Sequence, residues 1–195
     1  MKRGLLIILS GPSGVGKHTL WIDLLKETQL RLAYSISMTT RVKRFNEKNG
    51  REYFFVTRKI FESAIKKGKM LEYAQYCNHY YGTPKSYVEK LRHKGMNVLL
   101  EIDAQGGINL IKQFKNIDQG LVSIFVLPPS TEHLIKRLCS RGTEDKKTID
   151  YRIKQAKWEI KQAKHYDYKI INDKISVAKK QLKSILINAI KKNAN

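Results

Sequence analysis

A glycine-rich segment near the start of the chain restricts the possible folds more than any other feature. It reads Gly11-Pro12-Ser13-Gly14-Val15-Gly16-Lys17, and it lies between an apolar run at residues 5–9 and a helical pattern at residues 20–28. A buried strand before such a loop and a helix after it are the setting of a phosphate-binding P-loop. Backbone N–H groups and the positive end of the helix surround phosphate oxygens there, and the lysine reaches the β- and γ-phosphates. The segment therefore predicts a nucleoside triphosphate site.

The residue after the lysine departs from the usual P-loop pattern. His18 stands where many P-loops carry the Ser or Thr whose hydroxyl binds magnesium. Thr19 carries a hydroxyl, but its side chain leaves a helix about 100° away from that of residue 18. We therefore expect magnesium to be held mainly through water, and we expect His18 to be a loop residue rather than a catalyst. The predicted triphosphate-binding residues are Gly11, Pro12, Ser13, Gly14, Val15, Gly16, Lys17, His18 and Thr19.

The hydrophobic pattern predicts an α/β fold with a central parallel β-sheet flanked by helices. Apolar runs typical of fully buried strands lie at residues 5–9, 98–102, 121–127 and 168–171. Helical patterns follow at residues 20–28 and 108–114, and a carboxy-terminal helix is marked by the apolar positions Leu182, Ile185, Leu186, Ala189 and Ile190. Strands that alternate with helices favour a parallel sheet. Residues 36–91 and 130–159 interrupt the alternation, which indicates insertions into one domain of 195 residues.

Charge and cysteine content bear on the partners and the setting of the chain. The net charge of +21 would attract nucleic acid or an acidic membrane surface. The lysines, however, are scattered over predicted helix surfaces without interleaved aromatic residues, so we expect no nucleic-acid partner. No apolar run approaches the ~18 residues that cross a bilayer, so we expect no membrane association. Cys77 and Cys139 lack metal-ligand spacing, which favours a reducing, cytoplasmic location.

Several motifs after the P-loop resemble those of guanylate kinases. They are Ser37-Met38-Thr39-Thr40-Arg41-Val42-Lys43-Arg44, Glu72-Tyr73-Ala74-Gln75, Tyr80-Tyr81-Gly82-Thr83, Glu101-Ile102-Asp103-Ala104-Gln105-Gly106, Arg141-Gly142-Thr143-Glu144 and Tyr166-Asp167-Tyr168 with Asn172-Asp173. The resemblance covers nearly the whole chain. It implies a P-loop kinase that transfers the γ-phosphoryl group of ATP to GMP with Mg²⁺, as a monomer or homodimer.

The resemblance also implies a division of the chain into three parts. The core is expected to comprise residues 1–35, 92–128 and 160–195, the GMP-binding subdomain residues 36–91, and the helical lid residues 129–159. The residues implied to bind GMP are Ser37, Arg41, Arg44, Tyr53, Glu72, Tyr81, Thr83 and Asp103.

The chemistry of these side chains agrees with a GMP site. Arg41 and Arg44, with hydroxyl groups beside them, offer charge-assisted donors to a phosphate dianion. Guanine exposes N1–H and an amine as donors, and Glu72, Asp103 and the Thr83 hydroxyl offer acceptors. Adenine lacks this donor pair, so a site of this kind can discriminate against AMP by ~10⁴-fold.

A charged helical segment carries the arginines that we expect to act on the transferred group. Arg137 and Arg141 are four residues apart and would share a helix face, and Arg152 lies in a second helical pattern. Phosphoryl transfer depends on positioning and charge neutralisation more than on covalent chemistry. The expected catalytic residues are therefore Lys17, Arg41, Arg137, Arg141 and Arg152. The resemblance further places Asn172 near the adenine of ATP.

The sequence departs from the family pattern at a few positions besides His18. Lys43 replaces a usual proline, Asn78-His79 replaces Gly-Asn, and Glu101 stands where aspartate is common. Asn78 tolerates a left-handed backbone almost as well as glycine does, so we expect the turn before Tyr80 to be kept.

Three other functions remain open at this point. The chain could be a scaffold module of the same fold that binds peptides, but Lys17 and the loop glycines are intact. It could be a kinase for another small acceptor, although Glu72 and Thr83 suit the donors of guanine. It could also bind nucleic acid through its charge, which would give a steep salt dependence.

Overall fold

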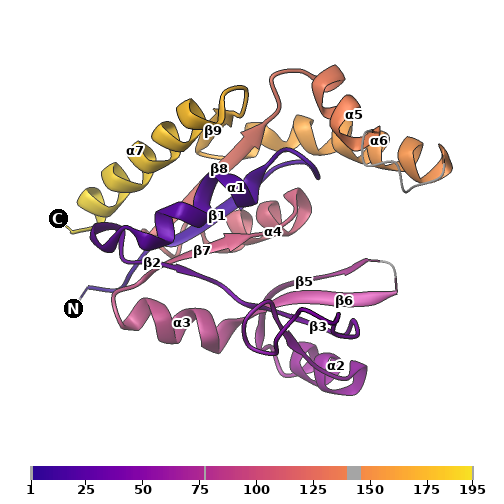
Figure 1. Cartoon of the computed structure of the whole chain (residues 1–195). Coiled ribbons are helices and arrows are strands. Elements are labelled where there is room, and N and C mark those ends of the chain that lie inside the picture. The colour runs from indigo at the N-terminus through magenta and orange to yellow at the C-terminus, as the bar shows by residue number, and fades with distance from the viewer. Residues whose placement is uncertain (1, 77, 140–145, 195) are drawn as a thin grey trace.

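A parallel sheet forms the centre of the computed structural model, which describes residues 2–76, 78–139 and 146–194. The sheet is five-stranded and its strand order is β2-β7-β1-β8-β9, with every neighbouring pair parallel (Figure 1). Its strands are β1 (Leu6–Ser10), β2 (Leu32–Tyr34), β7 (Asn97–Glu101), β8 (Leu121–Leu127) and β9 (Tyr168–Ile171). The predicted α/β fold with a central parallel sheet is confirmed.

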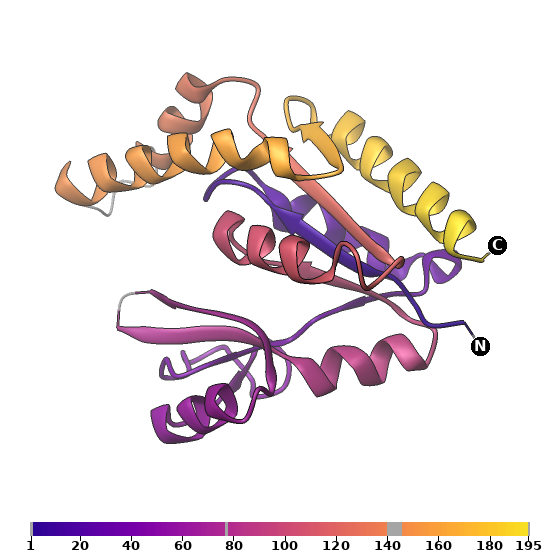
Figure 2. The ribbon, with the colours of Figure 1, turned by 180° about the vertical axis from the view of Figure 1, so that it is seen from behind.

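Helices cover both faces of this sheet because alternate residues of β1 point to opposite sides. Ile7 and Leu9 pack in a core cluster with the side chains of α1 (Lys17–Trp21) and α7 (Ile175–Ala194). Leu6 and Ile8 pack in a second cluster on the other face. That face is covered by α4 (Ala104–Phe114), α3 (Lys85–His93) and the short η3 (Gln162–His165), as Figure 2 shows.

A smaller sheet lies beside the central one, with the strand order β4-β3-β6-β5. Its strands are β3 (Ser37–Thr39), β4 (Tyr53–Phe55), β5 (Met70–Tyr76) and β6 (His79–Pro84), and α2 (Arg58–Lys66) precedes β5. β5 and β6 are antiparallel, and Asn78 in the turn between them has a φ of 62°. The prediction that Asn78 takes a left-handed backbone conformation at this turn is confirmed.

Two helices follow β8 and lie on the other side of the P-loop from the small sheet (Figure 1). They are α5 (Thr131–Cys139) and α6 (Lys146–Lys161). The carboxy-terminal part of α6 packs against the central sheet, because Ala156 lies in the same core cluster as Ile7 and Leu9. Both chain ends lie together at the opposite edge of the molecule, where the Asn193 amide donates a hydrogen bond to the Arg3 carbonyl.

The region after the P-loop differs from the predicted single helix over residues 20–28. α1 ends at Trp21 and is followed by the 3₁₀ helices η1 (Ile22–Lys26) and η2 (Thr28–Leu30). Glu27 between them has an extended backbone, with φ −84° and ψ 100°, which interrupts the helical hydrogen bonds. Strand β2 was not predicted because a strand of 3 residues is too short to show a hydrophobic period.

None of the helices in the described part of the chain is both long enough and apolar enough to cross a membrane.

Candidate active site

The P-loop wraps around the carboxyl end of β1, where backbone contacts demand glycine. Gly11 has a φ of 151°, and a Cβ atom there would lie 2.4 Å from the Val126 carbonyl oxygen of β8. Gly16 has a φ of 92° and directly precedes α1. The amide of Asn172 donates a hydrogen bond of 2.8 Å to the Val15 carbonyl oxygen. The Asn172 side chain is almost fully buried, and its hydrogen bond therefore stabilises the conformation of the loop.

The Lys17 side chain folds back into the loop. Its ammonium donates to the Gly11 carbonyl oxygen at 2.6 Å and lies 3.4 Å from the Pro12 carbonyl oxygen. Desolvation lowers the pKa of Lys17 below its usual value, and the carboxylates of Glu101, Glu159 and Asp103 partly offset this effect. Phosphate in the loop would add negative charge and favour the protonated ammonium. A phosphate bound in the loop would therefore raise the pKa of Lys17.

His18 is an exposed residue in the first turn of α1, so the expectation that it lies in a loop is wrong. The helix begins directly after Gly16, whose left-handed backbone closes the loop one residue before His18. Nδ1 of His18 lies 3.9 Å from Oε2 of Glu101, at the end of β7. The same oxygen accepts a hydrogen bond of 2.7 Å from the Trp21 indole.

This corner suits Mg²⁺ only when the ion arrives with phosphate and water. Mg²⁺ prefers oxygen ligands and keeps several waters, whereas imidazole suits other metals. Glu101 supplies the carboxylate beside position 18. In the described ranges, no group of three or more His, Cys, Asp and Glu side chains is arranged to hold a metal by itself.

On the small sheet, Arg41 lies in a cluster of polar and aromatic side chains. Its guanidinium makes two hydrogen bonds to the Glu47 carboxylate, at 3.0 and 2.7 Å. It also lies 5.5 Å from the ring centre of Tyr53, whose ring contacts that of Tyr81 edge-on at 6.0 Å between centroids. The hydrogen bond from Arg41 is the main reason that the pKa of Glu47 falls to about 2. The structure thus brings together Arg41, Tyr53 and Tyr81, as the sequence predicts.

Two other predicted phosphate-binding residues lie at the margin of this cluster. Ser37 is half-buried in β3, where it pairs in register with Tyr53. Arg44 is exposed, and its backbone N–H donates to Glu47 at 2.8 Å. Glu47 therefore links the backbone at Arg44 to the Arg41 side chain, a role that was not predicted from the sequence.

Two acidic side chains meet at the start of α4, one from the small sheet and one from the N-cap of the helix. Glu72 of β5 accepts a hydrogen bond of 2.6 Å from the buried Thr83 hydroxyl. Asp103 caps α4 by accepting the Gly106 N–H at 2.7 Å. A Cβ atom on Gly106 would lie 3.2 Å from Oε2 of Glu72 and 3.5 Å from Oδ1 of Asp103. The two carboxylates therefore converge around Gly106.

Burial raises the pKa of Glu72 to about 7, and the charge of Asp103 adds to this effect. Hydrogen bonds from the Thr83 hydroxyl and backbone act in the opposite direction. Thr83 is thus a hydrogen-bond donor to Glu72, and its effect on the site is to lower the pKa of that carboxylate.

Helix α6 contacts the P-loop directly. The Arg152 guanidinium donates to the Ser13 hydroxyl at 2.9 Å. Glu159, further along the same helix, is almost fully buried, and its charge acts on Lys17 of the P-loop. Among the other predicted lid arginines, Arg141 and the side chain of Arg137 lie outside the described residues.

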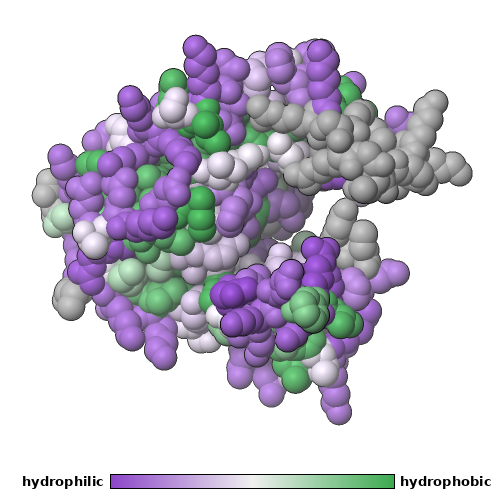
Figure 3. Space-filling view, in the orientation of Figure 1, coloured by the Kyte–Doolittle hydropathy of each residue, from purple (hydrophilic) through white to green (hydrophobic). Residues whose placement is uncertain are grey.

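A cavity of about 490 Å³ lies between the P-loop, the small sheet, the start of α4 and α6. Its walls come from the P-loop (Ser13), from β6 (Tyr81), from the start of α4 (Asp103) and from α6 (Arg152 and Glu159). Figure 3 shows the molecule hollowed between the small sheet and the central body. The cavity lies at the carboxyl ends of the parallel strands, where open α/β sheets bind their ligands.

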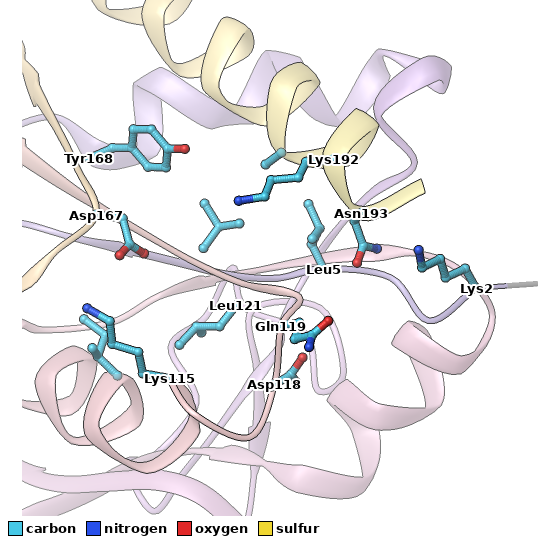
Figure 4. A pocket seen from close by; sticks show the side chains of 13 residues that line it. Lys2, Leu5, Lys115, Asp118, Gln119, Leu121, Asp167, Tyr168, Lys192 and Asn193 are labelled. Carbon is cyan, nitrogen blue, oxygen red and sulfur yellow. The ribbon is translucent and has the colours of Figure 1, made fainter. Parts of the chain in front are cut away.

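A second cavity, of about 540 Å³, lies at the opposite edge of the central sheet. Lys115 and Lys192 line it (Figure 4). These lysines lie at the carboxyl ends of α4 and α7, where cations offset the helix dipole. The Asp118 carboxylate in its wall is bound by Arg92. This cavity shares no wall with the P-loop.

Three acidic residues of the site were not among the site residues predicted from the sequence. Glu47 accepts hydrogen bonds from Arg41. Glu101 lies beside His18, and the charge of Glu159 acts on Lys17 of the P-loop. Glu101 alone carried a signal, because it alternates with Asp103 at the end of an apolar strand.

Comparison with known proteins identifies the family. Residues 3–189 match the family model of guanylate kinase. A guanylate kinase of Streptococcus pneumoniae (strain ATCC BAA-255 / R6) is 45% identical over 184 residues, which are 94% of this chain and 86% of that protein. A guanylate kinase of Listeria innocua is 45% identical over 185 residues, with 95% and 88% covered. The crystal structure of guanylate kinase from Anaplasma phagocytophilum has a TM-score of 0.74 and 33% identity, and the match covers 96% of this chain and 86% of that one. Together with the P-loop and the paired carboxylates, these matches show that the chain belongs to the guanylate kinase family, the P-loop kinases that phosphorylate GMP with ATP.

Proposed function

We propose that the chain phosphorylates GMP with the residues described above, and that the two nucleotides meet in the cavity of about 490 Å³. The observation that carries this assignment is the convergence of Glu72 and Asp103 around Gly106, in a site that also contains Ser13 of the P-loop. The half-buried Glu72 carboxylate and the exposed Asp103 carboxylate are acceptors that suit the N1–H and amine donors of guanine. An adenine base would leave the Glu72 carboxylate without a donor.

The phosphate of GMP binds at the Arg41 cluster. Its dianion takes donors from Arg41, Arg44 and the hydroxyls of Ser37, Tyr53 and Tyr81. In the structure the guanidinium of Arg41 is held in a bidentate contact by Glu47. Because this contact fixes the planar fork, less side-chain entropy is lost when phosphate binds. Glu47 is therefore part of the proposed acceptor site.

The triphosphate of ATP binds in the P-loop, and Lys17 contacts its β- and γ-oxygens. Thr19 and His18 lie in the first turn of α1 and present that end of the helix to the phosphates. Asn172 stabilises the loop through its hydrogen bond to the Val15 carbonyl oxygen. Its proposed contribution to ATP binding is therefore to position the loop.

The transfer is an in-line displacement. An oxygen of the GMP phosphate attacks the γ-phosphorus, the bond to the bridging oxygen of ADP breaks, and the products are GDP and ADP. No side-chain nucleophile takes part. Lys17 and the arginines at positions 41, 137, 141 and 152 compensate the charge on the transferred group.

Mg²⁺ is the proposed cofactor. It would enter with ATP, with Glu101 as the nearest protein carboxylate and water as the main ligand. When bound, the ion neutralises charge on the β- and γ-phosphate oxygens.

The proposed parts of the chain are a core of residues 1–35, 92–128 and 160–195, a GMP-binding subdomain of residues 36–91 and a lid of residues 129–159. Closure of the lid over both nucleotides would exclude water, which otherwise accepts the phosphoryl group. The contact of Arg152 with Ser13 supports a lid that reaches the P-loop. We further propose a cytoplasmic enzyme, monomeric or homodimeric, with no nucleic-acid or membrane partner.

Acceptor specificity tests this function. The purified protein is mixed with ATP, Mg²⁺ and GMP, AMP, CMP or UMP, and ADP formation is followed. We expect ADP formation that depends on GMP. We also expect the Lys17→Ala variant to be at least ~100-fold slower, as for loss of one preorganised charge-stabilising group.

The other outcomes would contradict the proposal in different ways. Turnover with AMP or a pyrimidine nucleotide alone would overturn the assignment of Glu72 and Asp103 to guanine. ATP binding without turnover would favour a scaffold of the same fold. A matched control is Lys59→Ala, because Lys59 is an exposed residue of α2.

A further inference from the structure

Two buried hydroxyl groups hold the backbone from which the Asp103 side chain projects. The Ser10 hydroxyl donates a hydrogen bond of 3.3 Å to the Asp103 carbonyl oxygen. The phenol of Tyr166 donates a hydrogen bond of 3.2 Å to the carbonyl oxygen of Ala104, the next residue. Ser10 is fully buried and Tyr166 is 5% exposed. The first turn of α4 is therefore bound by two side chains from other elements, and the reaction described above uses neither of them.

The fit between these hydroxyls and α4 depends on a glycine. A Cβ atom on Gly107 would lie 2.0 Å from Oη of Tyr166 and 2.7 Å from Oγ of Ser10, closer than van der Waals contact allows. The Tyr166 ring packs edge-on against Phe125 of β8, with 4.9 Å between the ring centroids, and both belong to the core cluster on that face of the sheet. Because the packed core fixes the ring, its hydroxyl is a fixed point of attachment for α4.

The direction of the Asp103 carboxylate depends on this backbone. The side chain is exposed and lines the cavity of about 490 Å³, so its neighbours restrict it less than they would restrict a buried side chain. It is held by the helix cap, in which Oδ1 accepts the Gly106 N–H at 2.7 Å. The Asp103 carbonyl oxygen accepts the Gly107 N–H at 3.0 Å in addition to the Ser10 hydroxyl. A shift of the first turn of α4 would therefore move the carboxylate with it.

Ser10 also connects this turn to the P-loop. It is the last residue of β1 and directly precedes Gly11, whose carbonyl oxygen accepts a hydrogen bond of 2.6 Å from the Lys17 ammonium. Tyr166 follows η3, which continues α6, the helix that contacts the P-loop. The two hydroxyls therefore fix Asp103 relative to the P-loop and to the carboxy-terminal end of α6.

We propose that Ser10 and Tyr166 are positioning residues for guanine recognition, because their hydroxyls set the place of the Asp103 carboxylate relative to the P-loop. This inference rests on the proposed binding of guanine by Asp103 and of ATP by the P-loop. Placement matters because a hydrogen bond weakens as its distance and angle depart from the optimum, and in-line transfer depends on how the two substrates are oriented. Neither residue is catalytic, since each acts on the substrate through Asp103.

Calorimetric titration with GMP alone, and separately with ADP and Mg²⁺, tests the proposal without turnover. Ser10→Ala and Tyr166→Phe each remove one hydroxyl and keep the rest of the side chain. We expect each variant to bind GMP about 2- to 10-fold more weakly than the wild type, as for loss of one hydrogen bond, and to bind ADP with unchanged affinity. Tyr168→Phe is the matched control, because it makes the same change at a tyrosine that is 42% exposed. It should bind GMP as the wild type does.

The same two substitutions in an Asp103→Asn background distinguish positioning from a general loss of structure. Asparagine is as good an N-cap as aspartate, so this background keeps the start of α4. If the hydroxyls act through the carboxylate, Ser10→Ala and Tyr166→Phe should have little further effect on GMP binding once that carboxylate is gone. An equal fold-loss of GMP affinity in both backgrounds would overturn the proposal.

The outcomes also separate this inference from the function on which it rests. If Asp103→Asn weakens GMP binding while both hydroxyl variants bind GMP as tightly as the wild type, the positioning role is wrong and the assignment of Asp103 to guanine stands. If the hydroxyl variants lose affinity for GMP and ADP to the same extent, the hydroxyls serve the fold as a whole, which also overturns the proposal. If Asp103→Asn leaves GMP binding unchanged, the assignment of Asp103 to guanine fails, and this inference fails with it.

Discussion

The Thr83 hydroxyl donates a hydrogen bond of 2.6 Å to Oε1 of Glu72, across neighbouring strands β6 and β5. Thr83 is fully buried, so its hydroxyl has a fixed partner and a fixed direction. The bond leaves Oε2 of Glu72 turned toward Gly106, 3.2 Å from a Cβ atom built there. A threonine on one strand thus aims a carboxylate on the next strand at Gly106, three residues after Asp103, which lines the cavity.

Glu72→Gln tests the role of this carboxylate in guanine recognition. We expect kcat/KM for GMP to fall about 10- to 100-fold, because a charge-assisted hydrogen bond becomes a neutral one and an amide N–H faces the guanine donors. Steady-state kinetics with varied GMP measures the effect. The KM for ATP should be unchanged, and an equal loss for both substrates would contradict the assignment.

The same variant should be more stable than the wild type at about pH 8. Burial raises the pKa of Glu72 to about 7, against 4.5 for an ordinary glutamate. Folding therefore disfavours the ionised form, and the penalty grows as the pH rises from about 4.5 to about 7. Thermal unfolding of both proteins at about pH 5 and about pH 8 measures this. A stability difference that is larger at the lower pH would show that the sign is wrong.

Binding of GMP should strengthen as the pH rises through about 7, the pKa to which burial raises Glu72. Guanine donors favour the ionised carboxylate, so GMP binding releases the proton that Glu72 holds at lower pH. We expect the dissociation constant to be about tenfold higher at about pH 6 than at about pH 8. Calorimetry with GMP alone measures it.

Glu72→Gln serves as the control for this pH dependence. The phosphate of GMP titrates equally with both proteins, so only the difference between them reports on Glu72. The same pH dependence in the variant would rule out Glu72 as its source.

The sequence predicts the parallel sheet because β1, β7 and β8 are buried on both faces and appear as unbroken apolar runs. It predicts the P-loop because the motif is local. The contacts that complete the site are not local: Arg152 and Ser13 lie 139 residues apart. Glu159 lies in a highly charged helix, where one buried acid cannot be distinguished from its exposed neighbours. Glu47 is hidden in the same way, since only the fold of its loop reveals that it holds Arg41.

Arg41→Lys tests the bidentate contact at the acceptor phosphate. A lysine keeps the charge but has no planar fork, so it cannot reproduce the two parallel hydrogen bonds that Arg41 makes to Glu47. We expect KM for GMP to rise about tenfold or more, while KM for ATP changes little. The control is Arg51→Lys, because Arg51 is an exposed arginine of the same region. Equal effects of the two variants would show that only charge matters at position 41.

Stability should depend strongly on a buried ion pair at the far edge of the central sheet. The Arg92 side chain is 1% exposed, and it donates to Asp118 at 2.5 and 3.0 Å and to the Gly4 carbonyl oxygen at 2.8 Å. Burial by itself would raise the pKa of Asp118, but the Arg92 guanidinium outweighs it and holds that pKa below the usual 3.8. The pair therefore stabilises the fold above about pH 4, and this stability is lost as the pH falls through the lowered pKa.

Asp118→Asn should lower the free energy of unfolding by up to about 3–5 kcal/mol, because it leaves the buried Arg92 charge with only Glu89, 3.5 Å away, as a counter-ion. Urea unfolding at neutral pH measures this loss. Asp23→Asn is the matched control: Asp23 pairs with Lys179 at an exposed site, where solvent screens the ion pair and little stability is lost. Activity with GMP should remain in the folded Asp118→Asn protein, since this pair lies at the sheet edge opposite the P-loop. If the two asparagine variants lost equal stability, the buried pair would contribute no more than a surface one.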